Sequence, residues 1–191
     1  MLTKQNIPNL LTYARVAAVP AALFIATVMP GLRQLMFWIF LLAAITDFFD
    51  GYLARKWNAV SATGALLDPI ADKLLVAVAL LYLLEYTNAP IGAVGIILCR
   101  ELYIAGLREF LAKRQIDLPV SRGGKWKTAL QLSAITLLLA TVANYPMPYL
   151  RVGEVMINAW NVGVILLWVS ALLALSSAFS YTRSAVRSIR I

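Results

Sequence analysis

Long apolar stretches alternate with short polar connections along almost the whole chain. A helix that spans a bilayer needs about 20 mostly apolar residues, and six segments approach that length. They lie near 10–29, 34–57, 66–86, 89–112, 127–144 and 155–181. The last segment is the cleanest, because no charged residue occurs from Val155 through Thr182. The pattern predicts an all-α integral membrane bundle of six transmembrane helices, with residues 1–191 as a single domain.

Proline, glycine and asparagine mark the ends of several predicted helices. Pro30-Gly31 follows the first, and Asn88 to Pro90 separate the third from the fourth. Pro69 is compatible with the third helix only if that helix begins near Leu67 or is kinked there. Residues 2–13 are amphipathic, so we expect a short interfacial helical segment before the first span, although an ordinary solvated start explains them equally well.

The composition agrees with a membrane protein. Hydrophobic residues make up 61% of the chain, whereas a soluble domain has about 45 to 50%. The formal net charge of +8 does not indicate nucleic-acid binding, because the basic residues flank or interrupt apolar segments. One cysteine and no histidine exclude an internal disulfide and a thiolate zinc cluster. Acid/base chemistry would therefore fall to carboxylate, lysine or tyrosine side chains.

The basic residues also predict an orientation. They concentrate in the N-terminal segment, two alternate connections and the C-terminal tail: Lys4, Arg15, Arg55, Lys56, Lys113, Arg114, Arg122, Lys125, Lys127, Arg183, Arg187 and Arg190. The opposite connections hold only Arg33 and Arg151. By the positive-inside rule, both termini face the cytoplasm and the protein is a multi-pass protein of the inner membrane.

Four aspartates stand out in the predicted second and third helices: Asp47, Asp50, Asp68 and Asp72. An unpaired carboxylate near the middle of a spanning helix costs roughly 2.5 to 3.5 kcal/mol, so positive charge is expected nearby. The members of each pair are three or four residues apart and share a helix face, and a short connection makes the two helices antiparallel neighbours. Such an all-oxygen cage suits two Mg²⁺ or Mn²⁺ ions about 3.5 to 4 Å apart.

Less specific interpretations exist for this region. The aspartates could form structural ion pairs with Lys73, Arg55 or Arg100. Gly51 would let a ligand approach the backbone beside Asp50, although small residues also serve ordinary helix packing in membranes. Arg55, four residues after Gly51, can present its guanidinium to a phosphate.

These residues also carry a family resemblance. Residues 47–72, DFFDGYLARKWNAVSATGALLDPIAD, match the pattern D-x2-D-G-x2-A-R-x8-G-x3-D-x3-D of the CDP-alcohol phosphotransferases. Three other stretches resemble the branch of bacterial enzymes that make phosphatidylglycerophosphate: NIPNLLTYARVAAVP, RELYIAGLREF and PVSRGGKWKTALQ. The resemblance covers nearly the whole chain and is weakest after about residue 135.

The resemblance implies an activity. The enzyme would transfer the phosphatidyl group of CDP-diacylglycerol to sn-glycerol 3-phosphate and release CMP. The four aspartates would hold two metal ions, and Asp72 would also accept the proton of the attacking hydroxyl. Gly51, Arg55 and Ser61 would contact the CDP part. Thr12 and Arg15 lie where the family's N-terminal segment closes that pocket, although an interfacial helix explains these two equally well.

The acceptor needs an anion site of its own. Arg100 and Arg108 are eight residues apart on the predicted fourth helix and can face one cavity. Lys125 lies where the fifth helix enters from the cytoplasm. In the family these three positions resemble the pocket for the acceptor phosphate. Arg100 could instead pair with Glu101 or an aspartate.

Lys127 we interpret as a topology signal on the cytoplasmic side, and we assign no role to Glu101 or Glu109.

Several alternatives remain open. Inositol phosphate is a second candidate acceptor, and a cation transporter is a candidate from another class, since intramembrane acids also mark ion pathways. A non-catalytic membrane scaffold is a third. The family commonly forms homodimers, and apolar outer helix faces allow one here. The sequence does not choose between Mg²⁺ and Mn²⁺.

Overall fold

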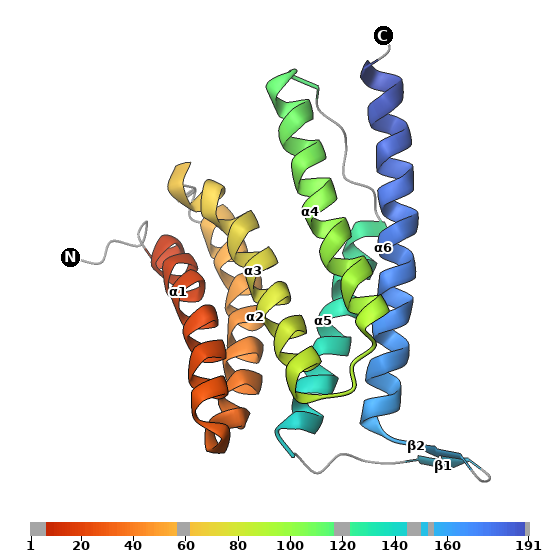
Figure 1. The fold of residues 1–191 in the computed structure, drawn as a ribbon. Helices are drawn as coiled ribbons and strands as arrows, with labels where there is room; N and C mark the ends of the chain where they lie inside the picture. Colours follow the sequence, from red (N-terminus) through yellow and green to blue (C-terminus); the bar gives the residue numbers. More distant parts are fainter. Residues whose placement is uncertain (1–6, 57–61, 117–122, 145–149, 153–154, 190–191) are drawn as a thin grey trace. The chain divides into compact units, whose positions relative to one another are not determined.

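A computed structural model of the chain describes residues 7–56, 62–116, 123–144, 150–152 and 155–189. Within these ranges it contains α1 (Ile7–Val28), a 3-10 turn η1 (Pro30–Leu32), α2 (Arg33–Lys56), α3 (Ala62–Tyr86), α4 (Ile91–Lys113), α5 (Gly123–Val142) and α6 (Ala159–Ile189) (Figure 1). Two short strands, β1 (Leu150–Val152) and β2 (Val155–Ile157), pair antiparallel with Leu150 opposite Ile157. The prediction of six helices is confirmed.

The helix starts differ from the sequence prediction by one to four residues, and the starts of α3 and α6 are the informative ones. α3 begins at Ala62, so Pro69 lies inside it and cannot donate a backbone hydrogen bond there. α6 begins at Ala159, and residues 155–157 form a strand. The side chain of Asn158 explains this second start, because its Oδ1 accepts a hydrogen bond of 2.9 Å from the backbone N–H of Asn161. This is the arrangement of an N-cap, which hydropathy alone does not reveal.

The expected interfacial segment is partly described. Residues 7–13 are the first two turns of α1 and continue into the rest of the helix. Residues 1–6 lie outside the described residues. In the part that is described, the proposed interfacial segment is therefore not a separate element.

The chain divides into two compact units, and the prediction of a single domain stays a prediction. The first unit holds residues 1–87 and 138–147, which include α1, α2, α3 and the end of α5. The second holds residues 88–137 and 148–191, which include α4, most of α5, the strands β1 and β2, and α6.

In the first unit, α1 packs against both α2 and α3. Its buried face is one stripe with steps of three or four residues: Thr12, Arg15, Val19, Ala22 and Ala26. Such steps keep all members on the same side of a helix. The apolar part of the stripe uses small residues, which allow close helix contacts, whereas its N-terminal part is polar. The polar part therefore meets α3 where Asp68 and Asp72 lie.

In the second unit, α4 packs against α6. Ile97, Ile104 and Leu111 of α4 are almost fully buried and occur every seven residues, which keeps them on one helix face. Leu167 and Ala171 of α6 have no exposed surface. The packed α4–α6 pair positions several charged side chains of the second unit.

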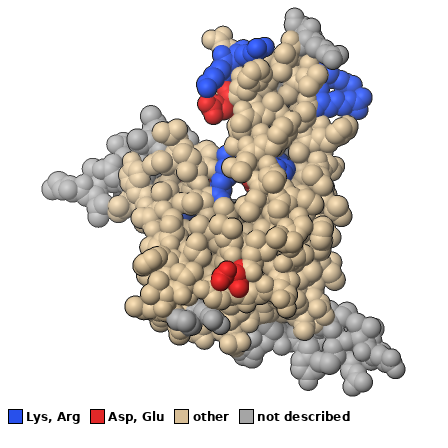
Figure 2. All heavy atoms as spheres, in the orientation of Figure 1, with Lys and Arg blue, Asp and Glu red and all other residues tan. Residues whose placement is uncertain are grey.

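One helix of the described residues, α6, is long and apolar enough to cross a membrane by length and composition. Shorter apolar stretches cover Thr12–Val28, Gln34–Thr46 and Lys127–Val142. Large apolar side chains also point outward, such as Leu102 and Phe179, each more than 70% exposed. Most of the face in Figure 2 carries no charged side chain. The prediction of six spans remains a prediction.

The buried stripe on α1 leads to a testable prediction about how α1 packs against α2 and α3. Ala22 has no exposed surface, so Ala22→Leu should overpack the contact and destabilise the protein by about 1 to 3 kcal/mol. The measurement is thermal unfolding in detergent. Ala21, its exposed neighbour, is the matched control, and Ala21→Leu should melt like the wild type. Equal melting temperatures for both variants would contradict this packing.

Candidate functional site

The described site residues form two polar groups, one in each unit. We call Thr12, Arg15, Asp68 and Asp72 the aspartate cluster, and Arg100, Glu101, Lys127 and Ser177 the glutamate cluster. The first joins α1 to α3, and the second joins α4, α5 and α6. Neither set of contacts follows from the sequence pattern alone.

The aspartate cluster consists of two parallel contacts between α1 and α3. The hydroxyl Oγ1 of Thr12 donates to Oδ1 of Asp68 over 2.7 Å. Arg15 Nη1 donates to Oδ1 of Asp72 over 3.3 Å. Thr12 and Arg15 are three residues apart, and Asp68 and Asp72 four apart, so each pair lies on one face of its helix. The two contacts therefore fix both aspartates against the N-terminal half of α1.

The ion pair in this cluster is unevenly buried. The side chain of Arg15 is 1% exposed, whereas that of Asp72 is 54% exposed. A buried guanidinium is costly unless it is paired, which Asp72 provides. The exposed part of the Asp72 carboxylate stays accessible to a solute. The arrangement can hold a carboxylate in a set direction at a surface.

Several predicted site residues are described by their backbone alone or not at all. The backbone of Asp47, Asp50, Gly51 and Arg55 belongs to the last turns of α2, but their side chains are not described. Figure 1 shows that α2 ends at the same end of the first unit where α3 begins. The backbone thus brings both predicted aspartate pairs to one end of this unit.

Ser61 falls wholly outside the described residues, and Lys125 belongs to the first turn of α5 by its backbone alone.

The donor chemistry fits a hard divalent cation. Among the described residues, no group of three or more His, Cys, Asp or Glu side chains is close enough to hold a metal ion. Asp68 and Asp72 are the two members of the predicted set whose side chains are described. Carboxylate oxygens one helical turn apart suit Mg²⁺ or Mn²⁺, and the chain has no histidine and a single cysteine for softer metals.

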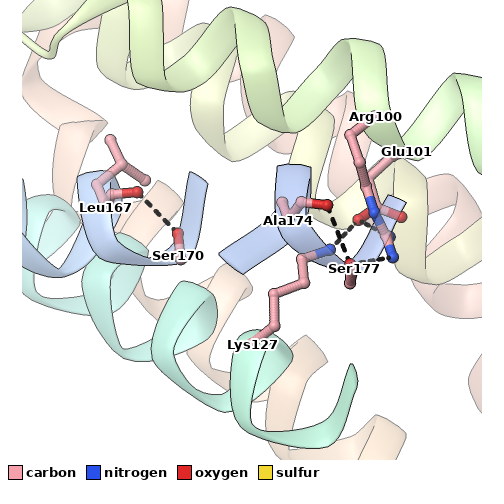
Figure 3. A network of polar contacts seen from close by, with 7 residues as sticks. All are labelled: Arg100, Glu101, Lys127, Leu167, Ser170, Ala174 and Ser177. Atoms are coloured by element: carbon pink, nitrogen blue, oxygen red, sulfur yellow. Dashed lines mark hydrogen bonds and ion pairs between the residues drawn. The ribbon is translucent and has the colours of Figure 1, made fainter. Parts of the chain in front are cut away.

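The glutamate cluster is centred on one carboxylate oxygen. Oε1 of Glu101 accepts a hydrogen bond of 2.8 Å from Arg100 Nη1 and another from Lys127 Nζ (Figure 3). Arg100 Nη2 donates to Ser177 Oγ over 3.1 Å. The side chains of Arg100 and Lys127 are 13% and 4% exposed. Two largely buried cations therefore share one carboxylate.

This cluster changes two interpretations made from the sequence. The pairing of Arg100 with Glu101, considered there as an alternative, is present. Lys127 is a buried partner of Glu101, whereas the sequence indicated a topology signal. The sequence did indicate that Lys127 needs a partner, since a charged residue inside an apolar segment has to be paired. Which cation Glu101 meets depends on how α5 packs, and that is not visible in a single sequence.

Arg108 lies on the same side of α4 as Arg100. Its guanidinium stands 5.6 Å from the ring centre of Tyr181 on α6, a cation–π distance, and Arg100 contacts Ser177 on the same helix. Both arginines therefore face α6.

Glu109, one residue on, pairs with Lys113 over 2.8 Å at the surface. This hydrogen bond raises the pKa of Lys113 above its ordinary value. The pair is an ordinary exposed contact between helix neighbours.

Most of the chain is similar in sequence to known proteins of one family. The sequence model of the CDP-alcohol phosphatidyltransferase family matches residues 5–176. Three similar proteins carry the name CDP-diacylglycerol–glycerol-3-phosphate 3-phosphatidyltransferase. The one from Rickettsia bellii is 40% identical over 185 residues, covering 96% of this chain and 97% of the relative. Those from Pectobacterium atrosepticum and Haemophilus influenzae are 38% and 36% identical, with at least 94% of each chain covered.

The shared carboxylate generates a stability prediction. Glu101→Leu should leave two buried cations without their acceptor and destabilise the protein by about 3 to 5 kcal/mol. Lys127→Met should cost less, because Arg100 still pairs with Glu101. The double variant should be more stable than Glu101→Leu alone, since it removes one unpaired cation. Additive losses in thermal unfolding would contradict a direct ion pair.

Proposed function

We propose that this chain, which belongs to the CDP-alcohol phosphatidyltransferase family, transfers the phosphatidyl group of CDP-diacylglycerol to sn-glycerol 3-phosphate and releases CMP. The observation that carries the proposal is the similarity, over 94% or more of both chains, to relatives named for this reaction. The contacts of the aspartate cluster support it, since they hold two carboxylates of the family's motif in set directions.

The proposed metal ligands are Asp47, Asp50, Asp68 and Asp72. With two Mg²⁺ or Mn²⁺ ions bound, the site would neutralise the charge of the diphosphate and of the departing CMP. The carboxylates of Asp68 and Asp72, one turn apart on α3, supply the hard oxygen donors that such ions prefer.

Asp72 is the proposed general base. The 1-hydroxyl oxygen of the acceptor forms a bond to the phosphatidyl phosphorus, the bond from that phosphorus to the CMP oxygen breaks, and the hydroxyl proton passes to the carboxylate of Asp72. The exposure of the Asp72 side chain, 54%, allows a substrate hydroxyl to reach it. Arg15 keeps this carboxylate directed through its ion pair.

Thr12 and Arg15 act through the aspartates in this account. Sequence resemblance assigns both to the CDP-diacylglycerol pocket, and the structure places their side chains against Asp68 and Asp72. Both are therefore positioning residues at the edge of the same pocket. Gly51, Arg55 and Ser61 remain the proposed contacts of the CDP part.

The proposed acceptor site contains Arg100, Arg108 and Lys125. The glutamate cluster supports an anion site in this part of the chain, because two largely buried cations there face a single carboxylate. A dianionic phosphate would balance the excess positive charge. Inositol phosphate carries the same group, and an acceptor panel distinguishes it from glycerol 3-phosphate.

The proposed location is the inner membrane, with both termini and the active site on the cytoplasmic side. The diacyl chains of the donor are lipid-soluble, whereas its CDP headgroup and glycerol 3-phosphate are water-soluble, so the site must open to both phases. The excess of Lys and Arg in alternate connections supports this orientation. Outward apolar side chains of α6, such as Phe179, support contact with lipid or with a second copy in a homodimer.

The direct experiment measures CMP release by the detergent-purified protein. With CDP-diacylglycerol, Mg²⁺ and glycerol 3-phosphate, we expect CMP and phosphatidylglycerophosphate in equal amounts, and no product in excess chelator. Inositol phosphate and serine are supplied in parallel as acceptors. Product from inositol phosphate alone would change the acceptor, and no product from any of them would overturn the proposal.

Asp72→Asn tests the assignment of the base. The variant should lower kcat by at least about 100-fold, since it removes the proton acceptor, and should retain binding of CDP-diacylglycerol. Glu85→Gln, at an exposed acid near the C-terminal end of the same helix, is the control and should keep full activity. A near-normal kcat for Asp72→Asn would show that another group accepts the proton.

A further inference from the structure

Gln131 is a buried polar side chain with no role in the proposed reaction so far. It lies on α5, its exposed fraction is 3%, and its Oε1 has no hydrogen-bond partner among the described residues. A buried acceptor without a partner costs about 1 to 3 kcal/mol. Proteins keep few such groups, and each calls for an explanation, such as a ligand or an ordered water.

A second buried atom is a hydrogen-bond donor without an acceptor. Nε of Arg100 is buried and has no acceptor within the described part of the chain, although both terminal nitrogens of the same guanidinium are engaged by Glu101 and Ser177. A guanidinium N–H is a strong donor to phosphate oxygens. Among the described side chains of the second unit, a buried donor on Arg100 and a buried acceptor on Gln131 therefore both lack a partner.

The glutamate cluster links the helices that carry these two atoms. Gln131 follows Lys127 by four residues, so both side chains lie on one face of α5. Lys127 contacts Glu101, the residue next to Arg100 on α4. The ion pair thus joins the face of α5 that carries Gln131 to the turn of α4 that carries Arg100.

The charge of the cluster favours an anion. Arg100 and Lys127 are two cations, Glu101 is one anion, and all three side chains are at least 79% buried. Excess positive charge that is shielded from water is stabilised by an anionic ligand. A ligand with an anionic phosphate and a hydroxyl would satisfy both the buried donor on Arg100 and the buried acceptor on Gln131.

We propose that Gln131 is an acceptor-binding residue. Its Oε1 accepts a hydrogen bond from the hydroxyl of glycerol 3-phosphate that does not react, while Arg100 Nε and the ammonium group of Lys127 donate to the phosphate. Glu101 is a positioning residue that holds both cations. The inference rests on the proposed function and extends it, because it makes Gln131 the residue that distinguishes a polyol phosphate from a simpler alkyl phosphate.

The test compares two acceptors in two proteins. The acceptors are glycerol 3-phosphate and 3-hydroxypropyl phosphate, which lacks the second hydroxyl. Wild type should prefer glycerol 3-phosphate by about tenfold in kcat/KM, the value of one satisfied hydrogen bond. In Gln131→Met, a substitution of similar size, the KM for glycerol 3-phosphate should rise about tenfold and the preference should vanish. The KM for CDP-diacylglycerol should stay unchanged.

Thermal unfolding without substrate separates a ligand contact from a structural one. If the side chain of Gln131 is satisfied only by a bound ligand, Gln131→Met removes a buried, unsatisfied acceptor. The variant should then melt at or above the wild-type temperature. Ser133→Ala, an exposed position on the same helix, is the control for both measurements. An unchanged acceptor preference in Gln131→Met, with a lower melting temperature, would overturn the inference and identify a structural hydrogen bond.

A binding measurement keeps this inference separate from the proposed reaction. Glycerol 3-phosphate should raise the melting temperature of wild type more than 3-hydroxypropyl phosphate does, and Gln131→Met should abolish the difference. This result would support the binding role even if no CMP were released, in which case the proposed function alone would fail. Equal shifts in both proteins would overturn the inference even if CMP release were normal.

Discussion

A charged side chain that is shielded from water needs an opposite charge or a strong hydrogen-bond partner, and this constraint shapes both units of the protein. In the first unit, the buried guanidinium of Arg15 meets Asp72, and the hydroxyl of Thr12 meets Asp68. In the second, one oxygen of Glu101 serves Arg100 and Lys127. Each contact joins different helices, so the pairing of charges also fixes how the helices pack.

The same contacts also hold the side chains that are proposed to bind metal ions and substrate. The stripe of α1 is apolar at Val19 and Ala22 and polar at Thr12 and Arg15, so one helix face both packs the first unit and directs two carboxylates. Arg15 is buried while the side chain of Asp72 is 54% exposed, which gives a fixed carboxylate that a solute can reach. In the glutamate cluster, by contrast, one carboxylate serves two cations. The first arrangement suits cation binding, and the second suits binding of an anion.

The sequence predicted the number of helices well because each is a long apolar segment between turn residues. It also predicted, from the spacing of Asp68 and Asp72, that they share one helix face, and in the structure both contact α1. It missed the strand at Val155–Ile157, because apolar β-branched residues raise hydropathy in strands and helices alike. It also missed the partners of Arg15 and Lys127, because those depend on the rotation of one helix against another. An unsatisfied atom such as Oε1 of Gln131 becomes visible only when burial is known.

The central claim is that the aspartates held by α1 bind divalent cations against a diphosphate. Electron paramagnetic resonance of Mn²⁺ titrated into the detergent-purified protein tests it most directly. In the presence of CDP-diacylglycerol, the account predicts about two bound ions per chain and a clear loss of binding in Asp68→Asn. The account would be contradicted if wild type bound no Mn²⁺ under these conditions, or if Asp68→Asn bound it as tightly.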